Sequence, residues 1–189
     1  GLGDVYKRQG SGKSTFIQHL NGLVKPTEGH IYYNGKDIYE QGFNMKELRS
    51  KVGLVFQYPE HQLFETDIFK DVCFGPKNLG LSRQEYELRA FESLRLVGLD
   101  ENLYYQSPFD LSGGQKRRVA IAGVLAMKPD VLILDEPTAG MDPEERIRIR
   151  NFISGCAKDK IVLLATHVVA DVENMAREIL LIKNGKIVR

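Results

Sequence analysis

The chain has 189 residues, of which 42% are hydrophobic and 27% charged, a composition typical of a globular domain and not of a disordered or collagen-like chain. Its 26 basic and 25 acidic residues give a net charge of +1, so no overall field would attract nucleic acid, and we expect no nucleic-acid partner. Cys73 and Cys156 match no metal-ligand spacing, and we expect buried free thiols. No apolar run approaches the roughly 20 residues that a membrane span requires.

The first nine residues do not fit the pattern that follows them. Gly1 to Gln9 is polar and shows no strand signal, and Asp4 to Gln9 resembles the in-frame translation of a transposon-derived sequencing adapter. We therefore expect residues 1–9 to be a non-native leader and residues 10–189 to be the native domain, truncated at both ends. The alternative is a genuine terminus that adds two cations to an unusual phosphate-binding loop.

A glycine-rich turn then leads into a helix with apolar periodicity. Such a turn, a P-loop, wraps backbone N–H groups around phosphate oxygens, and the helix N-terminus adds partial positive charge. Lys13 would reach the β- and γ-phosphates, and Ser14 would offer its hydroxyl to Mg²⁺. Lys7 stands where the full pattern has its first glycine. The residues of the turn are Gly10, Ser11, Gly12, Lys13, Ser14 and Thr15.

Short β-branched runs alternate with helical stretches along the rest of the chain, which predicts an α/β fold with a parallel sheet. Asn34-Gly35 and Asn184-Gly185 are typical of hairpin turns. The predicted strands are His30 to Tyr33, Val52 to Phe56, Val131 to Leu134, Ile161 to Ala165, Ile179 to Ile182 and Lys186 to Val188.

Helical spacing dominates between Asp67 and Met127. One face of this region carries the apolar residues Tyr86, Ala90, Leu94 and Val97. The charge run Lys116-Arg117-Arg118 could contact nucleic acid, but we expect it to form a solvated helix face.

Two carboxylates follow the predicted strand Val131 to Leu134. Acidic residues at a strand end are often simple caps, but with Lys13 upstream they predict a nucleotide-hydrolysing site. Asp135 would hold Mg²⁺, and Glu136 would act as the general base on the attacking water.

A further helix is predicted to begin just after this strand. Asp142 would be its N-cap, Pro143 would occupy its first turn, and Glu145 would close a capping box.

The segment Leu111 to Gln115, followed by a helix, resembles the signature motif of ATP-binding cassette (ABC) ATPases. Further landmarks of that family appear in order along the chain, namely Gln57, Asp142 and His167. The resemblance runs from Gly10 to Arg189. It implies a P-loop NTPase fold, an ABC-type nucleotide-binding domain with a RecA-like core and an inserted helical subdomain at about residues 64–118.

The resemblance also implies ATP and Mg²⁺ as cofactors and a role for each landmark. Glu136, His167 and Gln57 would be catalytic, with His167 on the γ-phosphate and Gln57 linking the metal site to a transmembrane partner. The metal would be held by Ser14, Gln57 and Asp135. The residues that bind nucleotide across a head-to-tail dimer, or communicate between its two sites, would be Ser112, Gly113, Gly114, Gln115 and Asp142.

Residues 43–140 are similar to the ATPases of energy-coupling factor (ECF) transporters, which import vitamins and cobalt or nickel ions. The similarity is carried by residues 51–64, 74–80 and 113–122. It implies that two such ATPases, alike or paired, dock on integral membrane transport subunits, at the cytoplasmic face of the cell membrane as peripheral proteins.

Three alternatives stay open at this point. Residues 144–150 and 165–173 look more like ATPases of two-component exporters, so the chain could be an exporter subunit or a chimera of the two groups. It could also be an inactive fragment. A cassette ATPase acting on nucleic acid would carry a long coiled-coil insertion or a tandem cassette, and this sequence has neither.

Overall fold

A three-stranded parallel sheet lies at the centre of the structure, a computed structural model that describes residues 12–173, 175–183 and 185–188. Its strands are β3 (Val52–Val55), β4 (Val131–Asp135) and β5 (Ile161–Ala165), in the order β3-β4-β5. These strands agree with the predicted ones to within a residue at each end. All three run in the same direction, so their carboxyl ends meet at one edge of the sheet.

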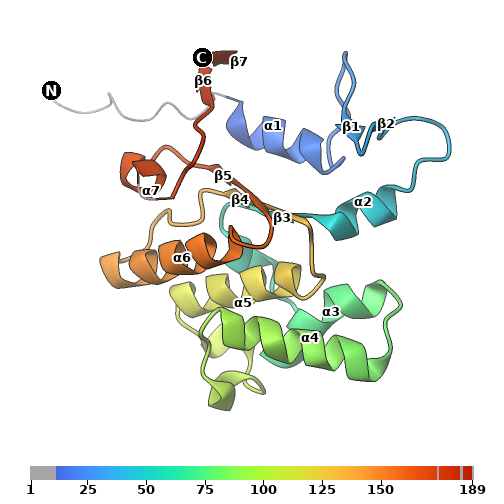
Figure 1. Ribbon diagram of the computed structural model, residues 1–189. Coiled ribbons are helices and arrows are strands. Elements are labelled where there is room, and N and C mark those ends of the chain that lie inside the picture. The colour runs from blue at the N-terminus through green and yellow to red at the C-terminus, as the bar shows by residue number, and fades with distance from the viewer. Residues whose placement is uncertain (1–11, 174, 184, 189) are drawn as a thin grey trace, which may run out of the picture.

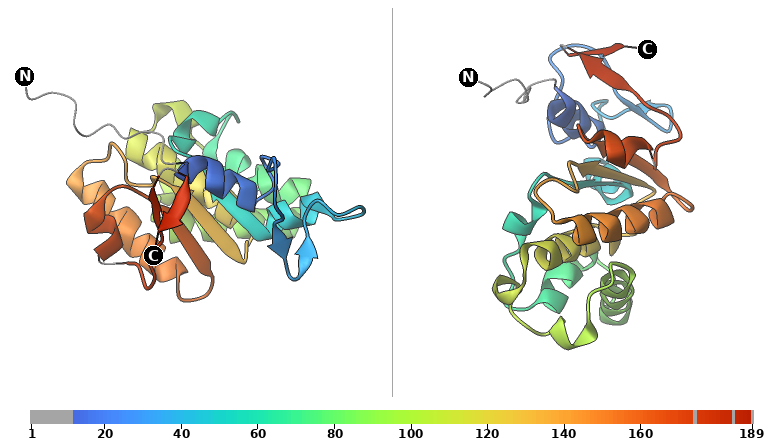
Figure 2. Two further views of the ribbon diagram at one scale, coloured as in Figure 1. Left: turned by 90° about the horizontal axis from the view of Figure 1, so that it is seen from above. Right: turned by 90° about the vertical axis from the view of Figure 1, so that its left-hand side faces the viewer.

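Side chains of the central strand alternate between two apolar cores. Leu132 and Leu134 face one core and Ile133 faces the other, and all three are fully buried. Because both faces of β4 must be kept from water, layers of helix cover the sheet above and below (Figures 1 and 2).

The upper layer in Figure 1 contains α1 (Lys13–Leu20), the hairpin β1 (Tyr32–Tyr33) and β2 (Lys36–Asp37), and α2 (Met45–Lys51). Asn34 and Gly35 form the hairpin turn with φ of 49° and 78°, as the sequence predicts. Ile17 of α1 is buried in the same core as Ile133, which fixes α1 above the sheet.

The lower layer contains α5 (Gly113–Leu125) and α6 (Pro143–Cys156), with α3 (Ile68–Asn78) and α4 (Arg83–Leu96) beyond α5 (Figure 1). Gly53 lets α5 approach β3, because a Cβ atom there would lie 2.6 Å from Cγ1 of Val124. Ala90 and Leu94 of α4 are fully buried, as the helical spacing predicts.

Residues 64–118, expected to form an inserted helical subdomain, contain α3, α4 and the start of α5. They also hold two 3-10 helices, η2 (Glu101–Leu103) and η3 (Pro108–Asp110). A further 3-10 helix, η1 (Pro59–Gln62), directly precedes them.

The last elements are α7 (Val169–Glu173) and an antiparallel hairpin of β6 (Leu181–Lys183) and β7 (Lys186–Val188). The strand expected from Ile179 therefore begins two residues later, at Leu181. Asn184 of the predicted turn lies outside the described residues.

Two remaining expectations from composition concern the thiols and membrane spans. Cys73 and Cys156 are buried free thiols, as expected. Within the described ranges, the helices lack the combination of length and apolarity that crossing a bilayer demands.

Candidate nucleotide-hydrolysis site

The carboxyl edge of the central sheet gathers residues that are far apart in the sequence. β4 ends at Asp135 with Glu136 next in the chain, and β5 ends just before Thr166 and His167. Gln57 follows the neighbouring strand β3 and is exposed. In open parallel sheets this edge is where ligands bind.

Glu136 and His167 are in direct contact at this edge. Oε1 of Glu136 lies 2.7 Å from Nδ1 of His167. Oε2 accepts hydrogen bonds from the Thr166 hydroxyl at 3.3 Å and from the His167 backbone N–H at 3.4 Å. The Glu136 side chain is 9% exposed and that of His167 is 68% exposed, so a buried carboxylate is oriented by a partner that solvent can reach.

The backbone of Glu136 has an unusual conformation. Its φ is 47°, in the left-handed region that non-glycine residues rarely adopt. The N–H of Glu136 donates to the carbonyl of Ala165 at 2.8 Å, which ties the residue to the end of β5. Strained, well-anchored residues of this kind are concentrated at functional sites.

Asp135 is the second carboxylate of the site, and its residue is 4% exposed. Burial raises the pKa of its carboxyl group above the usual range, although a hydrogen bond from Ser14 acts in the opposite direction. The charge of Glu136 raises this pKa further and that of Lys13 lowers it. These interactions bring the N-terminus of α1 to the carboxyl end of β4.

The residues around Asp135 fit a Mg²⁺ ion. Among the described residues, its Oδ1 atom is buried without a hydrogen-bond partner, and the Ser14 hydroxyl hydrogen-bonds to the same carboxyl group. The described ranges contain no cluster of three or more His, Cys, Asp or Glu side chains suited to a metal. Mg²⁺ is commonly held by one or two carboxylates together with substrate phosphates, so the small donor set is the expected one.

The phosphate-binding turn is described from Gly12 onward, and Gly10 and Ser11 lie outside the described residues. Gly12 is the N-cap of α1 with φ of 85°, and no side chain caps the helix there. Lys13, Ser14 and Thr15 form the first turn of α1, which contains no acidic residue. An uncapped helix N-terminus with this composition favours an anion.

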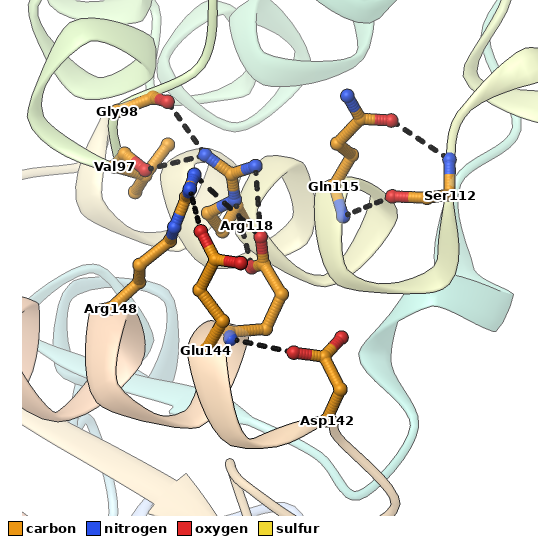
Figure 3. Close-up of polar contacts among 9 residues, drawn as sticks. Val97, Gly98, Ser112, Gln115, Arg118, Asp142, Glu144 and Arg148 are labelled. Atoms are coloured by element: carbon orange, nitrogen blue, oxygen red, sulfur yellow. Dashed lines mark hydrogen bonds and ion pairs between the residues drawn. The ribbon is translucent and has the colours of Figure 1, made fainter.

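The signature turn lies at the N-terminus of α5. Ser112 and Gln115 form a reciprocal capping box, with Gln115 N–H donating to Ser112 Oγ at 3.3 Å and Ser112 N–H donating to Gln115 Oε1 at 2.9 Å (Figure 3). Ser112 and Gly113 are exposed, while Gly114 is partly covered. No hydrogen bond or ion pair within the described part of the chain joins this turn to Asp135 or Glu136.

Asp142 caps α6 as the sequence predicts, accepting a hydrogen bond from Glu145 N–H at 2.9 Å, with Pro143 at the first position. The expected capping box is wrong in its second half. The Glu145 carboxylate turns instead to α5, where it lies 3.4 Å from Nε of Arg118. It also lies 3.9 Å from Nη1 of Arg148 on its own helix.

The expectation that Lys116-Arg117-Arg118 forms a solvated face is wrong for the two arginines. Arg117 is 4% exposed and Arg118 is 6% exposed. Arg117 lies four positions before buried Ile121 on α5 and Arg118 lies four positions before buried Ala122, so helical spacing could have indicated their burial. Their partners come from remote parts of the chain and carry no local signal.

Comparison with known proteins identifies the family. The model of the family described as "ABC transporter" matches residues 8–139. The chain is 54% identical over 181 residues to the energy-coupling factor transporter ATP-binding protein EcfA2 of Caldanaerobacter subterraneus subsp. tengcongensis. It is 52% identical over 181 residues to EcfA2 of Clostridioides difficile. Each match covers 94% of this chain and 63% of the relative, so the chain spans less than two thirds of the length of these relatives.

Solved structures give the same result. Over 96% of this chain and 72% of the other, the structure resembles cbiO1 of Clostridium perfringens, described as part of the ABC transporter complex cbiONQ, with a TM-score of 0.85 and 39% identity. It also resembles the ATP-binding cassette MJ0796, solved as a dimer in a post-hydrolysis state with ADP and Pi. That match has a TM-score of 0.82 and 30% identity, over 95% of this chain and 79% of the other.

The chain belongs to the ABC transporter family. Its resemblance to the ECF ATPases and its P-loop NTPase fold are confirmed. The alternative that the chain is an exporter subunit, or a chimera of the two groups, is not favoured, because the EcfA2 matches cover 94% of the chain and so extend through both parts.

Proposed function

We propose that this chain binds and hydrolyses ATP to power an ECF-type importer. The observation that carries the proposal is the buried Glu136 carboxylate, held by His167 at the sheet edge and next to Asp135, which Ser14 and Lys13 approach from α1. Relatives named energy-coupling factor transporter ATP-binding proteins support the transport role. The transported molecule, of the vitamin or transition-metal class, would be recognised by another subunit.

Nucleotide would bind at the N-terminus of α1. Its phosphates would accept hydrogen bonds from the turn at residues 10–15, and Lys13 would neutralise part of their charge. Ser14, Asp135 and Gln57 would hold the Mg²⁺, which supplies charge stabilisation to the transferred phosphoryl group when bound.

Glu136 would accept a proton from the attacking water. His167 orients this carboxylate through the contact at Nδ1. Its side chain is otherwise exposed, so the ring would be accessible to the terminal phosphate of a bound nucleotide. The exposed residues Ser112 and Gly113 would bind nucleotide held by a second ATPase subunit, together with Gly114 and Gln115, and Asp142 would pass information between the two sites. We also propose the domain division at residues 64–118 on this basis, since it contains the signature turn.

The partners of the chain would be a second ABC ATPase, alike or different, arranged head to tail, and integral membrane transport subunits. The dimeric structure of MJ0796 supports such a pairing. The protein would then be peripheral on the cytoplasmic face of the cell membrane.

The proposal is tested by phosphate release from Mg-ATP with the purified chain. The substitution Glu136→Gln removes the base while keeping the side-chain shape, so turnover should fall by about 10² to 10⁴. Nucleotide binding should be retained. Glu92→Gln is the matched control, because Glu92 is 53% exposed on α4 and forms only a surface ion pair.

Turnover that survives Glu136→Gln unchanged would contradict the assigned base. Absence of any turnover in the unaltered chain would support the alternative that this polypeptide is an inactive fragment.

A further inference from the structure

Arg117 of α5 is a buried cation that contacts two separate segments near the site. Its Nε and Nη2 atoms bind the two carboxylate oxygens of Glu60, each at 3.1 Å. Its Nη1 donates to the carbonyl oxygens of Pro137 at 3.2 Å and of Ala139 at 2.7 Å. The Arg117 side chain is 4% exposed and that of Glu60 is 16% exposed, so solvent screens this pair little.

The two segments that Arg117 contacts carry the proposed catalytic groups. Glu60 belongs to η1, which begins two residues after Gln57. Pro137 follows Glu136 directly, and Ala139 lies three positions after it. One planar guanidinium therefore joins the loop after β3 to the loop after β4, with fixed hydrogen-bond geometry on both sides.

Both loops contain a non-glycine residue in the left-handed region. Tyr58 has φ of 57° and Glu136 has φ of 47°. Such conformations persist where surrounding contacts hold them. The Arg117 guanidinium supplies a contact to each loop, since its central carbon lies 5.7 Å from the centroid of the Tyr58 ring.

The loop after Glu136 is held on its other side as well. Between Pro137 and Ala139, the Thr138 hydroxyl contacts the fully buried carboxylate of Asp171 on α7. Asp171 is in turn paired with Arg150 of α6. Thr138 thus fixes the loop to α7 through Asp171, and Pro137 and Ala139 tie it through Arg117 to η1.

We propose that Arg117 is a positioning residue that couples η1 to the catalytic carboxylate, so that a displacement of the Gln57 loop moves Glu136 relative to the nucleotide. This inference rests on the proposed function. It assigns to Glu60 and Arg117 a role in turnover although neither is proposed to touch nucleotide.

The first measurement is hydrogen–deuterium exchange of the full chain without nucleotide. Glu60→Gln breaks the charge pair on the η1 side of Arg117 and changes no residue of the loop at 136–142. If Arg117 couples the two loops, exchange in 136–142 should rise by about threefold or more. Glu92→Gln, which removes a carboxylate from an exposed ion pair, should leave that exchange unchanged. Faster exchange confined to residues 57–62 would overturn the inference.

The second measurement separates kcat from KM in Mg-ATP turnover. Arg117→Gln should lower kcat by about tenfold or more while KM for ATP stays within about threefold, because positioning is lost and phosphate contacts are kept. Arg117→Lys keeps the charge but not the paired hydrogen bonds, and should give an intermediate kcat. It also provides a folded comparison if Arg117→Gln fails to fold.

These results distinguish the inference from the proposed function. If the unaltered chain turns over ATP and both Arg117→Lys and Glu60→Gln match Glu92→Gln in kcat, the inference is wrong and the proposed function stands. If the unaltered chain shows no turnover, the proposed function fails, and the exchange experiment still decides whether Arg117 couples the loops.

Discussion

Glu136 has an unfavourable backbone conformation that several hydrogen bonds hold in place. Its left-handed backbone costs roughly 1–2 kcal/mol relative to a right-handed conformation. The hydrogen bond from its N–H to Ala165 and the contacts of its carboxylate with Thr166 and His167 offset that cost. The carboxylate is therefore held in place before any ligand arrives, which is the condition for an oriented base.

At the same scale, Cys73 gives a pH-dependent prediction. Burial, together with the charges of Glu87 and Asp67, raises the pKa of this thiol from 9.0 to about 11. Between these values the unfolded chain has lost the proton that the folded chain keeps, so this thiol makes the free energy of unfolding fall as pH rises from 9.0 to about 11.

Cys73→Ala should flatten that decrease, as measured by urea denaturation at a series of pH values. Titration of the lysines and tyrosines is common to both chains and cancels in the comparison. Identical pH slopes in the two chains would show that the Cys73 thiol is not protected in the folded state.

At the scale of elements, Arg118 joins three helices. It donates to the carbonyls of Val97 and Gly98 at the end of α4, the latter at 2.6 Å (Figure 3). It also pairs with Glu145 of α6. Gly114 allows α5 to approach Glu145 of α6, because a Cβ atom at position 114 would lie 2.9 Å from Cγ of Glu145. The signature turn and the Asp142 cap are thereby held in a fixed relation.

Glu145→Ala should therefore destabilise the fold by about 3 kcal/mol, because it leaves the Arg118 guanidinium buried without its countercharge. The neighbouring Glu144→Ala is the matched control. Glu144 is 76% exposed and pairs with Arg148 on the surface, so its loss should cost less than about 1 kcal/mol. Denaturant unfolding measures both, and equal losses would refute the importance of the interhelical pair.

The sequence predicts elements where the pattern is local and fails where a partner is remote. The strands β3, β4 and β5 could be predicted because each is a short apolar run next to polar or glycine residues. The cap at Asp142 is equally local. By contrast, Arg117 and Glu60 stand 57 positions apart, and helical spacing can indicate that Arg117 is buried but not which residue it pairs with.

The same distinction applies to the candidate site. The proximity of Asp135, Glu136 and His167 could be predicted from the strand ends, because each residue follows a parallel strand and parallel strands end at one edge. The Thr166 hydrogen bond to Glu136 and the turn of Glu145 toward Arg118 depend on side-chain orientation, which periodicity does not specify.

At the scale of the whole molecule, the two turns proposed to bind phosphate lie in different parts of the fold. The turn at α1 lies with Asp135 at the edge of the sheet, and the turn at Ser112 begins α5 in the layer below (Figure 1). An exposed, internally capped signature turn is suited to a ligand held by another molecule. In the proposed function, each hydrolysis site therefore combines Lys13 of one chain with Ser112 of its partner.

The most direct test of that claim is Mg-ATP turnover in a mixture of two inactive variants, Lys13→Ala and Ser112→Arg. In a head-to-tail pair of unlike variants, one site carries both defects and the other carries neither. Each variant alone should be inactive, and a random equal mixture should recover up to about a quarter of the unaltered turnover. A mixture no more active than its separate components would contradict the shared site.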